Sequence, residues 1–241
     1  MLWGRFASRA SEARYPQLWQ GLSAAWCPTA SGPTGLRLYD LTGYANAGTL
    51  TNLTPDNAWS RSGIAFSGLT NYIALPSGPS LQLGTSWSIT SVVTITSFQN
   101  FAQIVVFGGN GITLYSNNLC ILVNDNVVRG SSTTAFGNIR TTVTVTKEGT
   151  NYAVWLNGID KTSTLSDTGY GLGSTYAFNV GYSNTKWTGT LHAAYVHKRK
   201  LSGGEIRLLA TDNLAPIRSR NTVMFGTSGN RRRRILCGGN C

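Results

Sequence analysis

The side chains that could carry catalysis or hold a metal ion are few in this chain. Its 241 residues include 9 Asp and Glu, 2 His and 4 Cys. Glycoside hydrolysis needs two carboxyl groups that flank the scissile bond. Glu148 and Glu205 fall in an expected turn and an expected helix cap, and no Glu-x-Asp run occurs. We therefore expect no catalytic residues and no enzyme activity.

The histidines and cysteines do not form a recognisable site either. His192 and His197 precede the cluster 198–200 (Lys-Arg-Lys), whose charges would lower the pKa of His197. A surface or hydrogen-bonded histidine is the favoured interpretation of both. The cysteines lack the paired two-residue spacing of zinc sites, and Cys120, among Leu and Ile, is expected to be a small buried hydrophobe. We expect no metal and no cofactor.

The remaining cysteines, Cys27, Cys237 and Cys241, leave their redox state open. Cys237 and Cys241 bracket Gly-Gly-Asn, where a disulfide within or between chains is geometrically allowed. Free thiols are favoured, because no secretion route is visible. The first 26 residues contain Arg5, Arg9 and Arg14 but lack the apolar run of a signal peptide. No apolar run reaches the length of a membrane span.

The residue types of this chain are compatible with one class of ligand, a carbohydrate. Sugar sites use aromatic faces together with Asn and Asp side chains on loops at one rim of a sandwich. The candidates by residue type are Asp40, Tyr44, Asn46, Asn71, Tyr72 and Trp187. Asn110 and Tyr115 are further candidates on the same ground. Asn and Tyr are also ordinary turn and sandwich residues. For any single position, a structural role is the favoured interpretation.

Basic charge gathers at the two ends of the chain. The net charge is +11, although only 12% of the residues are charged. Residues 15–197 are nearly neutral, with seven basic and six acidic side chains. A neutral body with basic ends is typical of a domain that carries interaction arms. The arginines predicted to anchor a partner are Arg5, Arg9, Arg14, Arg218, Arg220, Arg231, Arg232, Arg233 and Arg234.

The arginine run 231–234 allows two kinds of partner. It would give a salt-dependent affinity for phosphate without sequence preference. The body, however, has no basic face and no nucleic-acid-binding motif. An acidic protein groove suits the run equally well, because Arg pairs with carboxylates in a bidentate way. We favour a protein partner over nucleic acid, and we expect no membrane contact.

The elements that would position these residues are short β-strands. Residues 87–96 and 139–146 each have mostly apolar side chains at every second position, the pattern of strands with one apolar face. Asn157-Gly158 between two apolar runs predicts a hairpin with a type I′ turn. Ser202 and Glu205 form a capping box that predicts one short helix. We divide the chain into an N-terminal arm (1–20), a β-sandwich domain (21–213) and a basic tail (214–241).

Several segments in order resemble concanavalin A-like (laminin G-like) jelly-roll domains. The resemblance implies an all-β sandwich of two antiparallel sheets with one short C-terminal helix, over roughly residues 20–212. The segments that carry it are 21–26 (GLSAAW), 38–50 (LYDLTGYANAGTL), 66–73 (FSGLTNYI), 87–89 (WSI), 154–158 (VWLNG), 189–195 (GTLHAAY) and 201–206 (LSGGEI).

The resemblance is less specific for function, because lectins, glycanases, adhesion modules and virus-particle proteins share this fold. Asp40 and Asn46 lie in a segment that corresponds to a loop of this family, and we keep them as candidates for that reason. Relatives often carry acidic residues where this chain has Ser67, Thr70 and Asn71. This loss of carboxylates weakens the case for calcium, which needs six or more oxygen ligands, although calcium stays open.

A jelly roll with basic ends resembles the proteins encoded beside head or tail genes in tailed bacteriophages. The preferred expectation is a non-enzymatic virion structural protein that decorates the head or tail surface. Its partners would be capsid or tail proteins of the same particle, in a homo-oligomer. The alternative is a lectin or adhesin for cell-surface glycans, located outside the cell or at its surface. A nucleic-acid binder that acts through the arginine run is the third expectation.

Overall fold

The computed structural model describes most of the chain between residues 6 and 219. The described ranges are 6–7, 9–67, 70–99, 102–115, 118–123, 126–132, 138–162, 167–171, 175–181 and 187–219.

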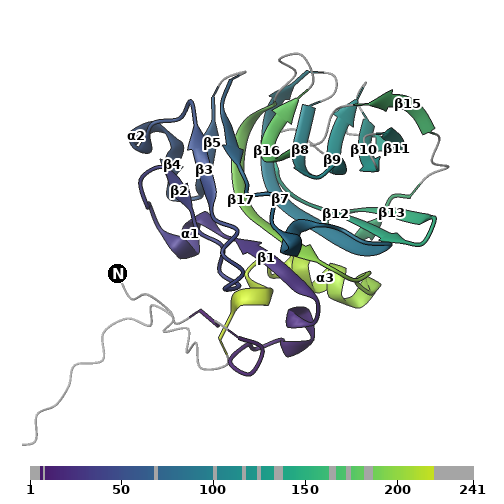
Figure 1. Ribbon diagram of the computed structural model, residues 1–241, viewed down its shortest axis with the longest axis horizontal. Helices are drawn as coiled ribbons and strands as arrows, with labels where there is room; N and C mark the ends of the chain where they lie inside the picture. Colours follow the sequence, from purple (N-terminus) through teal and green to yellow (C-terminus); the bar gives the residue numbers. More distant parts are fainter. Residues whose placement is uncertain are drawn as a thin grey trace, which may run out of the picture.

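The described strands form two antiparallel sheets, one of eight strands and one of nine, that face each other (Figure 1). This arrangement confirms the predicted all-β sandwich. The eight-stranded sheet contains, in spatial order, β14 (Ile159–Asp160), β13 (Asn151–Leu156), β12 (Arg140–Glu148), β7 (Ser86–Phe98), β17 (Trp187–His197), β5 (Gly63–Phe66) and β4 (Trp59–Ser60), with β1 (Leu22–Trp26) paired to β17. The nine-stranded sheet contains β15 (Asp167–Gly171), β11 (Asn126–Ser132), β10 (Asn118–Val123), β9 (Asn110–Tyr115), β8 (Ala102–Phe107), β16 (Tyr176–Gly181), β6 (Tyr72–Ala74), β3 (Gly48–Thr51) and β2 (Arg37–Leu38).

Helical structure in the described chain is short. Only α3 (Gly203–Thr211) exceeds one turn or so; the others are α1 (Pro28–Ser31), α2 (Pro55–Ala58), η1 (Pro16–Trp19), η2 (Pro79–Leu81) and η4 (Ala215–Ile217). The predicted capping box is present at α3, where the Ser202 hydroxyl accepts from the Glu205 N–H. No helix in these ranges is long and apolar enough to cross a membrane.

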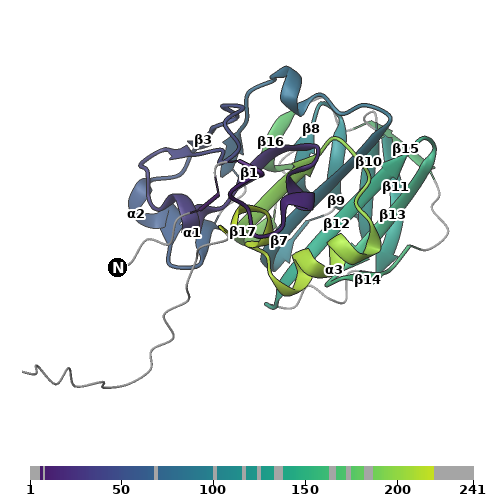
Figure 2. The same cartoon turned by 90° about the horizontal axis from the view of Figure 1, so that it is seen from below.

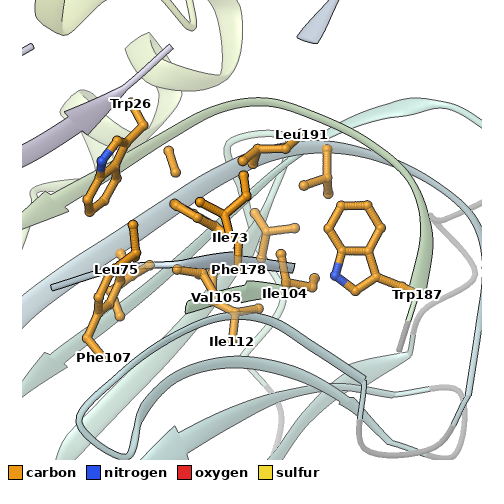
Figure 3. Close-up of a cluster of buried hydrophobic side chains, with 14 of the residues drawn as sticks. Trp26, Ile73, Leu75, Ile104, Val105, Phe107, Ile112, Phe178, Trp187 and Leu191 are labelled. Carbon is orange, nitrogen blue, oxygen red and sulfur yellow. The ribbon is translucent and has the colours of Figure 1, made fainter. Parts of the chain in front are cut away.

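Aromatic and aliphatic side chains from both sheets fill the space between them (Figure 3). The alternation predicted for β7 places Trp87, Ile89, Val93 and Ile95 in this core. At one end, the Trp26 ring stacks on Phe107 with a centroid distance of 5.8 Å and meets Phe178 edge-on. Burial of such apolar area is the main stabilising contribution to a sandwich of this size.

A second apolar cluster covers the outer face of the eight-stranded sheet. Helix α3, η1 and η4 lie on this face (Figure 2), and β1 adds Leu22 and Ala25 from within the sheet. Their apolar side chains, among them Leu18, Ile206, Leu209 and Ile217, surround Tyr195 of β17. Ser88, Thr90 and Ser91 of β7 are therefore buried too, a feature that the alternating pattern did not predict.

The two ends of the described chain lie together on this covered face. Phe6 pairs with Arg218, and Ala13 pairs with Ser219, as isolated antiparallel bridges. The N-terminal arm contains three large side chains with apolar surface, Tyr15, Leu18 and Trp19. All three side chains join the second cluster, and Leu18 is fully buried.

Candidate functional site

Asp40 organises the loop between β2 and β3 by accepting hydrogen bonds on both carboxylate oxygens. Its Oδ1 accepts from the backbone N–H of Ala25 and of Thr42, each at 3.0 Å. Its Oδ2 accepts from the backbone N–H of Asn46 at 3.2 Å and from the Asn46 side-chain amide at 2.9 Å. The Thr42 hydroxyl adds a contact at 2.8 Å to Oδ1. One carboxylate thus ties the loop to β1 and to itself.

Asn46 closes the same loop from the other side. It is buried, its amide nitrogen donates to the Ser23 carbonyl at 3.0 Å, and its Oδ1 accepts from the Ser80 hydroxyl at 2.7 Å. The Asn46 carbonyl accepts from Trp26 Nε1 at 2.8 Å. The two residues retained from the predicted sugar site, Asp40 and Asn46, are thereby brought together, and their polar groups are used within the protein.

The loop held in this way presents large side chains to solvent. Tyr44 is 60% exposed, Leu36 47% and Tyr39 45%. Gly43 and Ala45 both adopt left-handed backbone conformations, with φ of 84° and 59°, so Tyr44 sits at a tight turn. We name residues 36–46 the aromatic loop. An exposed tyrosine face on an ordered loop is a surface on which a sugar ring can stack.

Arg37 and Tyr39 were missed by the sequence argument. The Arg37 guanidinium lies 5.9 Å from the centre of the Tyr39 ring, a cation–π arrangement. The available signal was strand alternation: buried Leu38 points inward, so its neighbours point outward.

The other predicted sugar-binding residues lie elsewhere and are used within the fold. Asn71 is buried, and its Oδ1 accepts from the Ser67 N–H at 3.2 Å. Tyr72 is half-buried in β6. Trp187 is fully buried in the core, where its Nε1 donates to the Gln103 carbonyl at 3.2 Å. Its ring is therefore closed off from a surface ligand.

Asn110 and Tyr115 were the further sugar-binding candidates from the sequence. Asn110 is buried in β9, and its amide nitrogen donates to the Gly108 carbonyl at 3.1 Å. Tyr115 ends the same strand, and its side chain lies outside the described part of the structure.

The described arginines among the predicted anchors have partners within the chain. Arg9 pairs with Glu12 at 2.8 Å on the surface, and Arg14 lies 5.4 Å above the Tyr15 ring. Arg218 pairs with Asp212 at 2.8 Å, and this hydrogen bond raises the pKa of Arg218. The remaining predicted anchors and the terminal cysteines lie outside the described residues: Arg5, Arg220, Arg231, Arg232, Arg233, Arg234, Cys237 and Cys241.

Both histidines are buried and hydrogen-bonded. His192 Nε2 lies 2.8 Å from the Thr94 hydroxyl, and burial lowers the pKa of His192. His197 Nε2 lies 2.9 Å from the Leu18 carbonyl, and burial lowers the pKa of His197 to about 4. The neighbouring cations, from which the sequence argument expected this shift, contribute less than burial does. Arg199 is the cation that adds to it.

Acidic, histidine and cysteine side chains do not gather into a metal site in the described ranges: no three of them come together in a way that would hold an ion. Cys27 is buried with a free thiol, and burial raises its pKa. That the chain takes no metal and no cofactor, with calcium left open, stays a prediction.

Comparison with known proteins gives matches in structure alone. No protein-family model and no curated protein matches the sequence. Trypanosoma rangeli sialidase in complex with sialic acid has a TM-score of 0.56 and 14% identity, over 79% of this chain and 32% of the sialidase. Domain 4 of AbnA, a GH43 extracellular arabinanase from Geobacillus stearothermophilus, in complex with arabinotriose, has a TM-score of 0.57 and 19% identity, over 78% of this chain and 98% of that domain. The binding domain of Paraclostridial Mosquitocidal Protein 1 has a TM-score of 0.54 and 14% identity, over 79% and 52%.

These matches agree with a jelly-roll, lectin-like sandwich and correct one expectation. The sequence predicted a protein that is not an enzyme, and this prediction is contradicted, because the matched sialidase and arabinanase are enzymes. The relation is one of fold, since all three identities are below 20%. This chain also spans only about a third of the sialidase. A shared fold does not by itself assign a reaction.

Proposed function

We propose that this chain is a carbohydrate-binding β-sandwich and that the aromatic loop is its sugar-binding surface. The observation that carries the proposal is the exposure of Tyr44 and Tyr39 on a loop whose backbone is held by Asp40 and Asn46. Tyrosine rings offer an apolar face to the C–H groups of a sugar ring, while their hydroxyls stay available for hydrogen bonds.

The rigidity of the loop favours binding. Ordering a flexible loop on association costs free energy that is lost from the affinity. Here the backbone N–H groups of Thr42 and Asn46 already donate to the Asp40 carboxylate before any ligand arrives. The two tyrosines are therefore presented in a defined arrangement, and an incoming sugar does not have to order them.

The structural comparisons support a carbohydrate ligand. Domain 4 of AbnA has been solved with arabinotriose, and the sialidase with sialic acid. The mosquitocidal-protein match is itself a binding domain. These ligands belong to those proteins, and we take from them only the class, a saccharide.

A glycan array on the full chain, followed by titration of the best saccharide, tests this function. We expect Tyr44→Ala to weaken binding at least tenfold and Tyr39→Ala to weaken it less, because Tyr39 is less exposed. Ile159→Ala is the matched control, since Ile159 is 59% exposed on β14, which belongs to the other sheet.

Running the array with and without calcium separates a calcium-dependent site from the loop itself. A blank array in both conditions would refute the proposal. Binding that Tyr44→Ala leaves unchanged would instead move the site away from the aromatic loop.

A second candidate function is attachment to a particle, as a surface domain of a tailed phage bound to neighbouring head or tail proteins. The observation that favours it is the pairing of Phe6 with Arg218 and of Ala13 with Ser219, which starts both basic ends from one side of the domain. Two basic segments from one side act as a single multivalent anchor on an acidic surface.

Deleting residues 220–241 and measuring co-sedimentation with particles tests the attachment. We expect the deletion to reduce incorporation, and unchanged incorporation would exclude this role of the tail. The sedimentation velocity of the isolated protein gives its oligomeric state in the same series.

A further inference from the structure

The described N-terminal residues, 6–7 and 9–20, cross the outer face of the eight-stranded sheet as a separate layer. Its backbone bonds to the last described residues of the chain: the Ala7 N–H donates to the Ile217 carbonyl at 2.8 Å, and the Arg14 N–H donates to the Arg218 carbonyl at 2.7 Å. Leu18 fills the second apolar cluster and is fully buried. We call residues 6–7 and 9–20 the N-terminal strap.

Three carbonyls at the end of the strap are held by two side chains, His197 and Arg199, that lie two positions apart in sequence. His197 Nε2 lies 2.9 Å from the Leu18 carbonyl. Arg199 donates to the carbonyls of Gln17 and Gln20, at 2.8 and 2.7 Å. The Gln17 carbonyl also accepts from the Gln20 N–H at 3.2 Å, so the two side chains add to the backbone bonding at this end of the strap.

The ring of His197 is enclosed and has one free nitrogen. The side chain is fully buried, and Nδ1 has no hydrogen-bond partner among the residues that the structure describes. With a carbonyl as the partner of Nε2, this nitrogen carries the proton and donates, and Nδ1 is the bare nitrogen of a neutral ring. A second proton on Nδ1 would therefore create a buried N–H without an acceptor and a buried positive charge.

The charged groups that face this ring come from two places. Arg199, just beyond β17, opposes protonation, and Glu205 of α3 favours it. Glu205 is itself paired with Arg199 at 2.6 Å. The other elements against the ring, η1, β1 and β7, contain no titratable side chain. Protonation of His197 is therefore easiest when the strap leaves and water reaches the ring.

A pivot for such a movement lies directly after the strap. Gly21 separates η1 from β1 and has φ of 69°, in the left-handed region that glycine tolerates. The Lys198 N–H donates to the Gly21 carbonyl at 2.7 Å. This bond anchors the pivot to the sheet, so the strap can leave while β1 stays paired with β17.

We propose that His197 is an acid-sensitive latch, and that protonation of its ring releases the N-terminal strap while the sandwich stays folded. The released state exposes the apolar surface that Leu18 covers and frees the strap for other contacts. This device does not depend on whether the aromatic loop binds a sugar.

The sign and size of the effect follow from linkage. Burial holds the pKa of His197 at about 4 in the docked state, against an ordinary value of 6.5. The released state therefore binds the proton more tightly, and docking weakens as the pH falls from 6.5 towards 4. The released-to-docked ratio at pH 5 should be roughly thirty times that at pH 7.5. The pKa of Glu205, about 2, lies below this window.

Hydrogen–deuterium exchange of the full chain between pH 7.5 and 4.5 tests the latch, with labelling times corrected for the intrinsic pH dependence of exchange. We expect exchange at the Ala7 and Arg14 amides to rise about thirtyfold by pH 5, while the β17 amides stay protected. In His197→Gln, the side-chain amide can still donate to the Leu18 carbonyl but does not titrate, so this pH dependence should disappear. His192→Gln is the matched control, because it removes the other buried histidine and should leave the dependence of the strap intact.

Two results would overturn the proposal. One is an equal pH dependence of strap exchange in His197→Gln and in the wild-type protein. The other is loss of β17 protection in parallel with the strap, which is global acid unfolding. If His197→Gln does not fold, the imidazole resonances of the wild-type protein decide. Titration of His197 with a midpoint of 6.5 or higher, while the strap stays protected, rules out the latch.

Discussion

Removal of the Asp40 carboxylate should loosen the aromatic loop and destabilise the domain. In Asp40→Ala, the backbone N–H groups of Ala25, Thr42 and Asn46 all lose their acceptor. In Asp40→Asn the shape of the side chain is preserved, but one carboxylate oxygen is replaced by an NH₂ group. Because both oxygens of Asp40 accept from N–H groups, this NH₂ group would face N–H donors in either orientation. Both substitutions should therefore be costly, and the isosteric one should not rescue the loop.

The magnitude follows from the number of bonds and their exposure. Each hydrogen bond to a charged acceptor contributes about 1.5–3 kcal/mol when it is shielded from water. The loop is half-exposed, so water replaces part of what is lost, and we expect about 3 kcal/mol for Asp40→Ala and about 2 kcal/mol for Asp40→Asn. With a urea m-value of about 3 kcal/mol/M, the larger cost lowers the unfolding midpoint by about 1 M.

Urea unfolding followed by tryptophan fluorescence measures this change. The Trp26 indole donates to the Asn46 carbonyl, so the loop and the probe are linked. Asp160→Ala is the matched control, because the Asp160 side chain accepts one exposed hydrogen bond, from the Thr162 N–H at 2.8 Å. It should cost less than about 1 kcal/mol. If Asp40→Ala costs no more than Asp160→Ala, the carboxylate does not hold the loop, and the rigidity argument for the sugar site fails with it.

Three further predictions concern other parts of the fold. Burial alone would raise the pKa of Glu205, but hydrogen bonds from Arg199 and from the helix cap lower it to about 2. The carboxylate therefore stabilises the fold above pH 4.5, and this contribution is lost as the pH falls towards 2. Glu205→Gln should cost about 1–2 kcal/mol at neutral pH, after allowance for solvent screening, and urea titrations at pH 7, 4 and 3 should show the gap closing. Gly189→Ala should unfold or strongly destabilise the protein, because a Cβ there would lie 1.9 Å from a carbonyl oxygen of β7. Gly43→Ala, also at positive φ but in open space, should cost only about 1 kcal/mol by thermal unfolding. The Cys27 thiol, buried and with a raised pKa, should react with a thiol reagent only after denaturation, and rapid reaction of the native protein would contradict its burial.

The local elements of the fold could be predicted from short-range patterns. Asn157-Gly158 forms the predicted turn, with φ of 50° and 77° at its two residues. The Ser202 cap starts α3 as expected. The short helices α1 and α2 escaped prediction, because four residues are too few to show a helical period.

The candidate site was predictable only in part. Asp40, Asn46 and Tyr44 lie in one loop and were chosen together by residue type. Trp187 was chosen on the same grounds and lies in the core. Residue type cannot separate an exposed aromatic ring from a buried one, because burial depends on the strands that cover it.

The amino-acid sequence by itself determined the β-strand content, the hairpin and the C-terminal helix, because these follow from backbone preferences and side-chain alternation over a few residues. Only the tertiary structure decided which polar groups are available. Asp40 accepts from Ala25, and His197 meets Leu18 across 179 positions of sequence. Such partners are set by the segments that the fold brings over each face. The same long-range packing carries the basic N-terminal arm onto its own sandwich and encloses a histidine that the sequence alone allowed to lie at the surface.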